Sequence, residues 1–321
     1  FLGEAGSDST PRYTMKALLL YDLKHIGGGP RHVFDLAEKL GEPGTGVTPT
    51  KAPVSRVTPA SVRALAAEAR RYDLVHTHAG RSGVAGRLAA AMAGVPAIHT
   101  WHGFHPERWS VGRHVLERVL RRHTAAFIHV SRSQALHGLR HGFHGTWVLN
   151  GVRSVPLPRR IEPAHGQEVL SVGRWDDPVK GADILVRAWN LVPETRLLML
   201  GPKPSFDVGN RWVWLLGSGN PADFYGLAAV YVAASWAEGC PYAVLDAMAA
   251  GLPVVATRVR GHADLVVDRS TGLLVPPGDP PALAKAIRSL LYDPDRARQM
   301  GRAGAERAAL HFTMDQMARG V

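Results

Sequence analysis

The sequence predicts an α/β protein with two Rossmann-like βαβ domains that face a central cleft. Apolar segments of strand length alternate with helix-length segments through both halves of the 321 residues. This alternation is typical of parallel sheets covered by helices on both faces. The alternation restarts after a Pro-rich connector at 155–163, and the length suits two domains of about 150 residues each.

The elements expected in each half follow from this alternation. In the first half, strands are expected near 16–21, 73–77, 96–100, 125–130 and 146–149, with helices at 30–40, 82–93, 111–123 and 133–140. In the second half, strands are expected near 168–172, 196–200, 213–216, 230–234, 254–256 and 273–275. Residues 1–14 are polar and precede a Met that opens the first strand, so we interpret them as a leader or tag remnant.

Composition limits the class of protein. Hydrophobic residues make up 45% and charged residues 20% of the chain, which is ordinary for a soluble protein with a sizeable core. No apolar run reaches the ~18 residues that a membrane span needs. The single cysteine, Cys240, excludes a disulfide framework and favours a reducing cytoplasm.

Positive charge is concentrated in the first half of the chain. Residues 1–160 hold 22 Lys and Arg against 10 Asp and Glu, whereas residues 161–321 hold 16 against 17. Such asymmetry indicates an anionic partner for the N-terminal half, such as a phospholipid surface, a lipid-linked phosphate or nucleic acid. Solvated faces in an arginine-rich protein remain the alternative.

The segment 231–256 places two carboxylates around the start of a helix. Pro241 suits the first helical position and Gly251 suits the helix stop, so Glu238 lies in the loop before the helix and Asp246 lies inside it. Helical side chains lean toward the N-terminus, where free N–H groups and the helix dipole also favour anions. The pattern predicts a diphosphate site flanked by two acceptors for sugar hydroxyl groups.

Two cations follow the first strand of the second half. In the segment 171–181, Gly173 and Arg174 end the strand, and Lys180 with Gly181 precedes a helix. A planar guanidinium and a compact ammonium at one cleft would offset the negative charge that develops on a diphosphate leaving group. We therefore expect Arg174 and Lys180 to act together with the two carboxylates.

A glycine-rich loop follows the first predicted strand. Gly27, Gly28 and Gly29 open a helix, and glycines there let backbone N–H groups approach a phosphate or a sugar. The spacing differs from the dinucleotide-binding fingerprint and from the P-loop, because neither G-x-x-G nor Gly-Lys-Ser/Thr follows. A plain tight turn remains the alternative.

Several histidines cluster after the strands of the first half. His99, His102 and His105 are spaced at i, i+3 and i+6, with His76 and His78 nearby in the sequence, and zinc binding is one interpretation. We favour loop and core roles, because the segment is turn-like and has no adjacent thiol or acidic partner. No metal site is expected.

The segment 231–256 resembles the Glu-x7-Glu signature of retaining glycosyltransferases of the GT-B fold, family 4 (glycosyl transferases group 1), and the glycine, histidine and Arg174–Lys180 motifs resemble other motifs of the same family. The resemblance covers residue 15 to about 307, and one departure is that the second acid is Asp246, one methylene shorter. It implies an acceptor-side domain at 15–152, a linker at 153–166, a nucleotide-sugar-binding domain at 167–306 and a C-terminal helix at 307–321 that crosses back to the first domain.

The resemblance also implies roles for individual residues. The catalytic set would be His102, Arg174, Lys180 and Glu238. The donor would be bound by Gly28, Gly29, Arg174, Lys180, Glu238, Gly239, Tyr242, Ala243, Val244 and Asp246. Within this set the sugar would contact His102 and Glu238, the diphosphate would contact the two cations and the helix start, and the ribose would contact Asp246.

The expected function is transfer of a sugar from a nucleotide diphosphate sugar to an acceptor hydroxyl with retention of configuration, without metal or cofactor. Cell-envelope glycolipid or polysaccharide synthesis at the cytoplasmic face of the plasma membrane is expected, with an anionic or lipid-linked acceptor and no nucleic acid. One alternative is a UDP-sugar 2-epimerase of the same fold, although no additional cleft carboxylates and histidines for elimination can be placed. A non-enzymatic basic membrane- or nucleic-acid-binding module is the other, and it leaves Glu238 without a role.

The predicted helix 111–123 is basic and amphipathic. We expect Val115, Leu116, Val119 and Leu120 on one side, with arginines around them. Such a helix can lie on an anionic lipid surface. Packing of its apolar side on the sheet is the more frequent arrangement.

Overall fold

The computed structural model describes residues 14–22, 28–78, 80–104, 109–153, 168–192 and 195–321. The chain divides into two compact units, residues 1–100 with 110–126 and residues 101–109 with 127–321. The predicted leader at 1–14, apart from its last residue, and nearly all of the predicted linker at 153–166 lie outside the described residues. The predicted domain limits therefore stay predictions.

Six strands form the first sheet, in the order β2-β1-β3-β4-β5-β6. The strands are β1 (Met15–Asp22), β2 (Val47–Val54), β3 (Leu74–His78), β4 (Ala97–Trp101), β5 (Ala126–His129) and β6 (Thr146–Trp147). The helices between them are α1 (Gly28–Leu40), α2 (Pro59–Ala69), α3 (Arg81–Ala93), α4 (Val111–Arg121) and α5 (Arg132–Arg140). Leu18 and Leu20 lie on the same face of β1, because they are two residues apart, and they pack with residues of α2 and α3 in one buried cluster.

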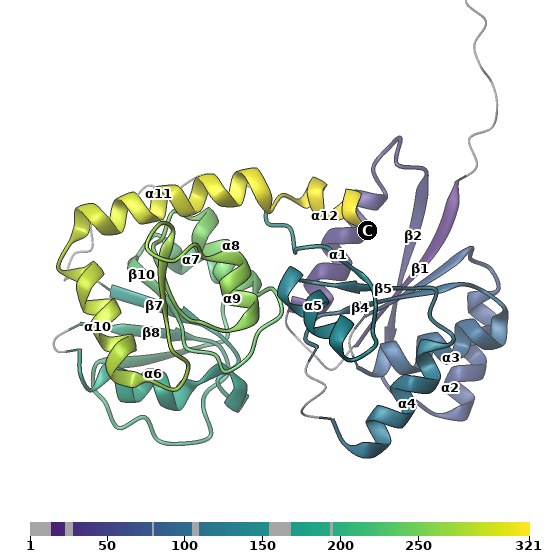
Figure 1. The fold of residues 1–321 in the computed structure, drawn as a ribbon, viewed down its shortest axis with the longest axis horizontal. Coiled ribbons are helices and arrows are strands. Elements are labelled where there is room, and N and C mark those ends of the chain that lie inside the picture. Colours follow the sequence, from purple (N-terminus) through teal and green to yellow (C-terminus); the bar gives the residue numbers. More distant parts are fainter. Residues whose placement is uncertain (1–13, 23–27, 79, 105–108, 154–167, 193–194) are drawn as a thin grey trace, which may run out of the picture. The chain divides into compact units, whose positions relative to one another are not determined.

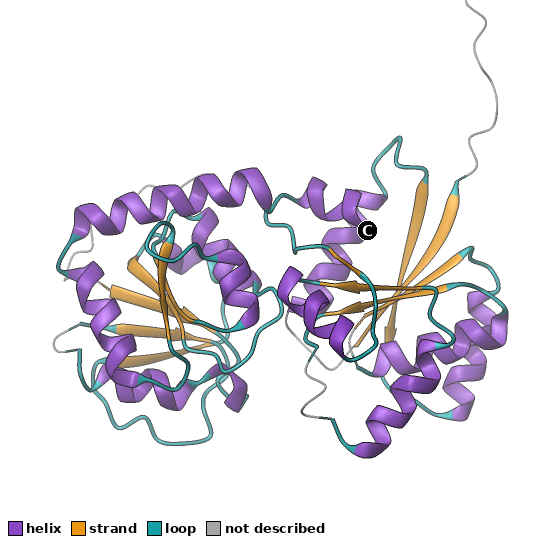
Figure 2. Ribbon diagram, viewed as in Figure 1, coloured by secondary structure: helices purple, strands orange, loops and turns teal. Residues whose placement is uncertain are grey.

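The second sheet also has six strands, in the order β12-β11-β10-β7-β8-β9, and all neighbouring strands are parallel (Figures 1 and 2). The strands are β7 (Glu168–Val172), β8 (Leu197–Leu200), β9 (Val213–Gly217), β10 (Ala228–Ala233), β11 (Val254–Thr257) and β12 (Gly272–Val275). The helices are α6 (Ala182–Trp189), α7 (Ala222–Tyr225), α8 (Tyr242–Ala249), α9 (Arg260–Leu265), α10 (Pro280–Leu291), α11 (Pro294–His311) and α12 (Met314–Gly320). These two parallel sheets with interleaved helices confirm the predicted fold class.

Both faces of the second sheet are buried, as the continuous apolar strands predict. Val169 and Leu197 belong to the core cluster that includes α6 and α10, whereas Leu170 and Leu198, one residue further along the same strands, belong to the cluster that includes α8. This alternation with a period of two residues produces the arrangement in Figure 1, where α6 and α10 lie on one face and α8 and α9 on the other.

One strand and one helix of the first half were not predicted from the sequence. The strand β2 contains Pro49 and Pro53, which pair with Ala17 and Tyr21 of β1. Proline lacks an N–H and is tolerated on an edge strand, and β2 is the edge of its sheet. The helix α2 begins after Thr58, whose hydroxyl accepts a hydrogen bond from the Ser61 N–H.

Helix α4 lacks the single apolar side that the sequence predicts, so this prediction is wrong. Val111, Val115 and Val119 are 82%, 59% and 46% exposed, whereas Leu120 is fully buried. Residues one position apart differ by about 100° around a helix, so the valines and the leucines lie on different faces. On the buried side Glu117 pairs with Arg87 of α3 at 2.8 Å, and both side chains are inaccessible to solvent.

The chain ends in two helices. The range predicted as one helix, 307–321, contains the last turns of α11 and the separate helix α12. Between them the Phe312 carbonyl oxygen accepts a hydrogen bond from the Val152 N–H at 2.7 Å, so this junction lies beside the segment that follows β6. Among the described residues, no helix combines the length and the apolar character that spanning a membrane requires.

Candidate active site

Strand order places the candidate site in the second sheet. The chain leaves β7 in one direction through β8 and β9, and it returns to the other side of β7 with β10. Ligands of such sheets bind at the carboxyl ends of the two strands where this reversal occurs. Arg174 and Lys180 follow β7, and Glu238 follows β10, so the predicted cations and the first predicted carboxylate meet at this edge.

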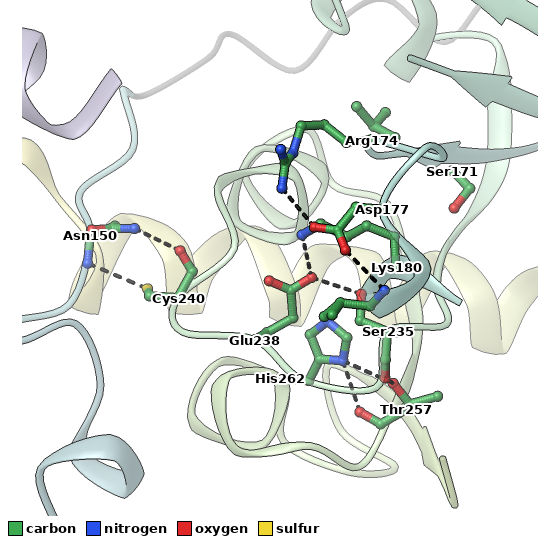
Figure 3. Close-up of polar contacts among 12 residues, drawn as sticks. Asn150, Ser171, Arg174, Asp177, Lys180, Ser235, Glu238, Cys240, Thr257 and His262 are labelled. Atoms are coloured by element: carbon green, nitrogen blue, oxygen red, sulfur yellow. Dashed lines mark hydrogen bonds and ion pairs between the residues drawn. The ribbon is translucent and has the colours of Figure 1, made fainter. Parts of the chain in front are cut away.

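The centre of the site is an ion pair between residues 58 positions apart in the sequence. The Lys180 Nζ lies 2.7 Å from Oε1 of Glu238, and the hydroxyl of Ser235 donates to the same oxygen at 2.7 Å (Figure 3). The side chains of Lys180 and Glu238 are 25% and 11% exposed. Both donors are thus aimed at one carboxylate oxygen in a mostly buried cavity, and Ser235 is a contributor that the sequence motifs did not indicate.

Glu238 remains a carboxylate despite its burial. Burial by itself would raise its pKa, but the charge of Lys180 and the hydrogen bonds from Lys180 and Ser235 act in the opposite direction. The pKa of Glu238 therefore lies below its ordinary value. At neutral pH the site presents a negative acceptor, which suits the hydroxyl groups of a sugar.

Arg174 lies at the start of the loop that leads from β7 to Lys180. Its Nη2 lies 2.6 Å from Oδ2 of Asp177, and the guanidinium side chain is 42% exposed. Asp177 also accepts the Val179 N–H at 3.1 Å, which fixes the single 3-10 turn over Pro178–Lys180. The loop from Arg174 to Lys180 is therefore braced by the carboxylate of Asp177. Lys180 lines the cavity, and Arg174 lies at the other end of the loop, directed at Asp177 (Figure 3).

Helix α8 begins at the same edge, one residue later than predicted. Pro241 is its N-cap, and its carbonyl oxygen accepts the N–H groups of Val244 and Leu245, both at 3.2 Å. The amides of Tyr242 and Ala243 precede the first bond of the helix, as expected for an anion-binding first turn. The predicted donor contacts of Tyr242, Ala243 and Val244 stay predictions.

The second predicted carboxylate lies inside α8. Asp246 is partly buried, and its charge and that of Glu238 both act on the buried phenol of Tyr231. Burial raises the pKa of Tyr231, and the two carboxylates raise it further. Tyr231 thus lies within electrostatic range of both acids, and the orientation predicted for Asp246 stays a prediction.

His102 and Gly239 meet through their backbones. A Cβ atom at position 239 would lie 1.9 Å from the His102 carbonyl oxygen, so only glycine allows this approach. On the same loop the Gln134 amide donates to the Glu238 carbonyl oxygen at 3.2 Å, and Asn150 donates to the Cys240 carbonyl oxygen at 2.6 Å. The backbone of the Glu238 loop is thus fixed by residues that sequence reasoning missed.

Other predicted residues of the first half are placed only within their own unit. Gly28 and Gly29 open α1 directly, as the glycine motif predicts. Two of the histidines considered for zinc contact threonine hydroxyl groups. Nε2 of His76 lies 2.7 Å from the Thr100 hydroxyl oxygen, and Nδ1 of His99 lies 2.8 Å from the Thr77 hydroxyl oxygen. No group of three or more His, Cys, Asp or Glu among the described residues is arranged to hold a metal ion.

Comparison with protein families agrees with this geometry. The family described as glycosyl transferases group 1 matches residues 166–293, and the glycosyl transferase 4-like domain matches residues 26–151. Glycosyltransferase EpsD of Bacillus subtilis is 30% identical over 288 residues, which cover 77% of this chain and 75% of EpsD. The chain belongs to the group 1 glycosyltransferases. It is a transferase enzyme, which favours the predicted function over the epimerase and the non-enzymatic module.

Other proteins show the same relationship. A D-inositol 3-phosphate glycosyltransferase of Acidothermus cellulolyticus is 31% identical over 309 residues, covering 80% of this chain and 68% of that protein. Among solved structures, Anabaena Alr3699/HepE in complex with UDP and glucose has a TM-score of 0.81 at 20% identity, covering 95% of this chain and 97% of HepE. Sucrose-phosphate synthase from Thermosynechococcus elongatus also has a TM-score of 0.81, at 24% identity and with coverages of 95% and 96%. These two structures confirm the GT-B fold.

Proposed function

We propose that this protein transfers a sugar from a nucleotide diphosphate sugar to a hydroxyl group with retention of configuration and without a metal ion. The ion pair of Lys180 with Glu238, at 2.7 Å beside the start of α8, is the observation that carries this proposal. It brings a phosphate-binding cation and a hydroxyl acceptor to one point. The solved structures of similar fold include complexes with UDP and with UDP-glucose, which supports a donor of this class.

The donor is proposed to lie across this edge of the sheet. Arg174, Lys180 and the first-turn amides of α8 bind the diphosphate, and Asp246 binds the ribose. Glu238 and His102 bind the sugar. Because the two cations and the helix dipole already offset the charge of the diphosphate, no metal ion is needed for the leaving group.

The reaction is proposed to proceed on one face of the sugar. The bond from the anomeric carbon to the β-phosphate oxygen breaks, and the acceptor oxygen attacks from the same face. The acceptor proton passes to the departing phosphate oxygen, so no covalent sugar–enzyme intermediate is required. The preorganised charges of Arg174 and Lys180 stabilise the charge that develops on the phosphate.

Donor hydrolysis tests the donor class. When the protein is incubated with UDP-, GDP- and ADP-sugars, we expect mass spectrometry to show slow release of free sugar in one nucleotide series. EDTA should leave the rate unchanged, and methanol added as a small acceptor should trap a methyl glycoside with the anomeric configuration of the donor. Absence of hydrolysis in all series, a requirement for a divalent ion, or the inverted glycoside would contradict the respective part of the proposal.

The acceptor is proposed to be anionic or lipid-linked and to be presented at a membrane surface during cell-envelope synthesis. The excess positive charge lies in residues 1–160, and the names of similar proteins include D-inositol 3-phosphate glycosyltransferase. Helix α4 adds an exposed face that suits a lipid surface, because Val111, Val115 and Val119 are exposed beside Arg118 and Arg122.

Liposome sedimentation tests the membrane contact. We expect the protein to pellet with vesicles that contain phosphatidylglycerol at low salt and to be released at high salt, because screening weakens attraction to anionic lipid. Replacing Arg118, Arg121 and Arg122 by Glu should reduce binding. The matched control replaces Arg63, Arg70 and Arg71 near α2, which are also exposed, and should bind more strongly than the α4 variant. Failure to pellet with either kind of vesicle would contradict the membrane contact, and equal binding to phosphatidylcholine vesicles would contradict its electrostatic origin.

A further inference from the structure

His262 lines the same cavity as Lys180 and Glu238 and has no role in the proposed function so far. It lies in α9, the helix that follows β11, and its side chain is fully buried. The helix can approach because the preceding residue is glycine: a Cβ atom on Gly261 would lie 2.3 Å from the Gly239 carbonyl oxygen. The imidazole is therefore fixed against the loop that carries Glu238.

The hydrogen bonds around His262 determine which ring nitrogen carries the hydrogen. The Thr257 hydroxyl donates to the Ser235 carbonyl oxygen at 2.5 Å, so toward the ring it acts as an acceptor. Nδ1 of His262 lies 2.8 Å from the Thr257 carbonyl oxygen and 3.3 Å from the Thr257 hydroxyl. Both neighbours accept, so Nδ1 is the donor, and in the neutral ring Nε2 is an acceptor.

Nε2 of His262 has no hydrogen-bond partner among the described residues, although it is buried. Figure 3 shows the ring between Thr257, on its Nδ1 side, and Glu238. Burial also lowers the pKa of His262, even though Glu238 acts in the opposite direction, so the neutral ring is favoured. A buried acceptor without a partner is unfavourable for folding and, in a binding cavity, points to a donor group on the ligand.

We propose that Nε2 of His262 accepts a hydrogen bond from a hydroxyl group of the transferred sugar, beside the contact that Glu238 makes. This rests on the proposed function, because it assigns a contact to the same donor. Two neighbouring acceptors select an uncharged sugar whose hydroxyl groups can donate to both. They disfavour a uronic acid, whose carboxylate would face the carboxylate of Glu238.

Donor binding by three proteins tests this contact: the unaltered chain, His262→Leu and His262→Gln. Calorimetry measures the affinity for UDP-, GDP- and ADP-glucose, for the corresponding free nucleotides and for monodeoxy analogues of the sugar. We expect one monodeoxy analogue to bind the unaltered chain about tenfold more weakly than its parent, which is the usual value of one hydrogen bond. His262→Leu should bind the parent and that analogue equally, whereas His262→Gln, which retains an acceptor, should keep part of the difference.

Free nucleotide affinity separates a sugar contact from a structural role. It should be the same in all three proteins, and so should the melting temperature of the two variants. If His262→Leu discriminates among the hydroxyl groups as the unaltered chain does, or if Leu and Gln weaken free nucleotide binding equally, the proposed contact is wrong. Failure of the unaltered chain to hydrolyse any donor would contradict the transfer proposal instead, since the comparison for His262 depends on binding alone.

Discussion

Replacing Glu238 by Ala should lower kcat for transfer by about 10²–10³-fold while changing nucleotide binding little. The physical reason is that its carboxylate, fixed by Lys180 and Ser235, is proposed to bind the sugar as the anomeric bond breaks, and preorganised contacts of this kind have about that effect on turnover. Loss of a contact made in the transition state lowers kcat and kcat/KM together. Steady-state kinetics with the donor selected by hydrolysis would measure both parameters.

Two matched variants make this result specific. Asp246→Ala, inside α8, should mainly raise KM because it removes a proposed ribose contact rather than a contact to the reacting sugar. Glu238→Gln preserves the size of the side chain and removes its charge, so a loss in this variant is due to the carboxylate and not to a cavity. Near-normal turnover of Glu238→Ala, with a normal melting temperature, would show that the proposed role of Glu238 is wrong.

Much of the site could be predicted because parallel strands bring distant residues to one edge. Arg174 and Lys180 follow one strand and Glu238 follows another, and the order β10-β7-β8 makes these strands neighbours. The sequence thus indicated which residues lie together, since each motif ends a strand and opens a helix. It did not indicate that Lys180 and Ser235 both contact the same oxygen of Glu238, which depends on the loop conformations.

His262 shows what sequence patterns do not reveal. Its role depends on the tautomer set by Thr257 and on the approach of α9 to Gly239, and both are tertiary features. One signal was present in the sequence, because the histidine lies six residues beyond the strand predicted at 254–256, near the edge where ligands bind.

The first half was less predictable for local reasons. The sequence pattern does not predict β2, because the segment contains two prolines and proline is unusual in a strand except at a sheet edge. In α4 the sequence pattern predicts one apolar side, but Val115 is exposed and Leu120 is buried. The buried pair of Arg87 with Glu117 occupies the protein-facing side of this helix, and no sequence pattern indicates that a charged pair takes this position.

Replacing Lys180 by Met should lower kcat/KM. The expected loss of transition-state stabilisation is about 2–4 kcal/mol, as for other preorganised charge contacts. Arg174→Met should produce a loss of the same order if both cations bind the diphosphate. The Lys180 variant has a second expected effect, because its ammonium is the largest of the influences that lower the pKa of Glu238. Without Lys180 the effect of burial is less opposed, and the pKa of Glu238 should rise.

A higher pKa of Glu238 in Lys180→Met would reverse the way in which the contribution of Glu238 to folding stability depends on pH. In the unaltered chain Glu238 binds its proton less readily when folded, so it stabilises the fold above its unfolded pKa, and this contribution is lost as the pH falls through the lower folded pKa. In Lys180→Met a pKa raised above the unfolded value would destabilise the fold as the pH rises. Melting temperatures should therefore differ more between the two proteins at neutral pH than at acidic pH, and Lys180→Met with Glu238→Gln should remove most of that difference. A gap that is independent of pH, or that persists in the double variant, would show that Lys180 stabilises the fold through packing and not through the charge of Glu238.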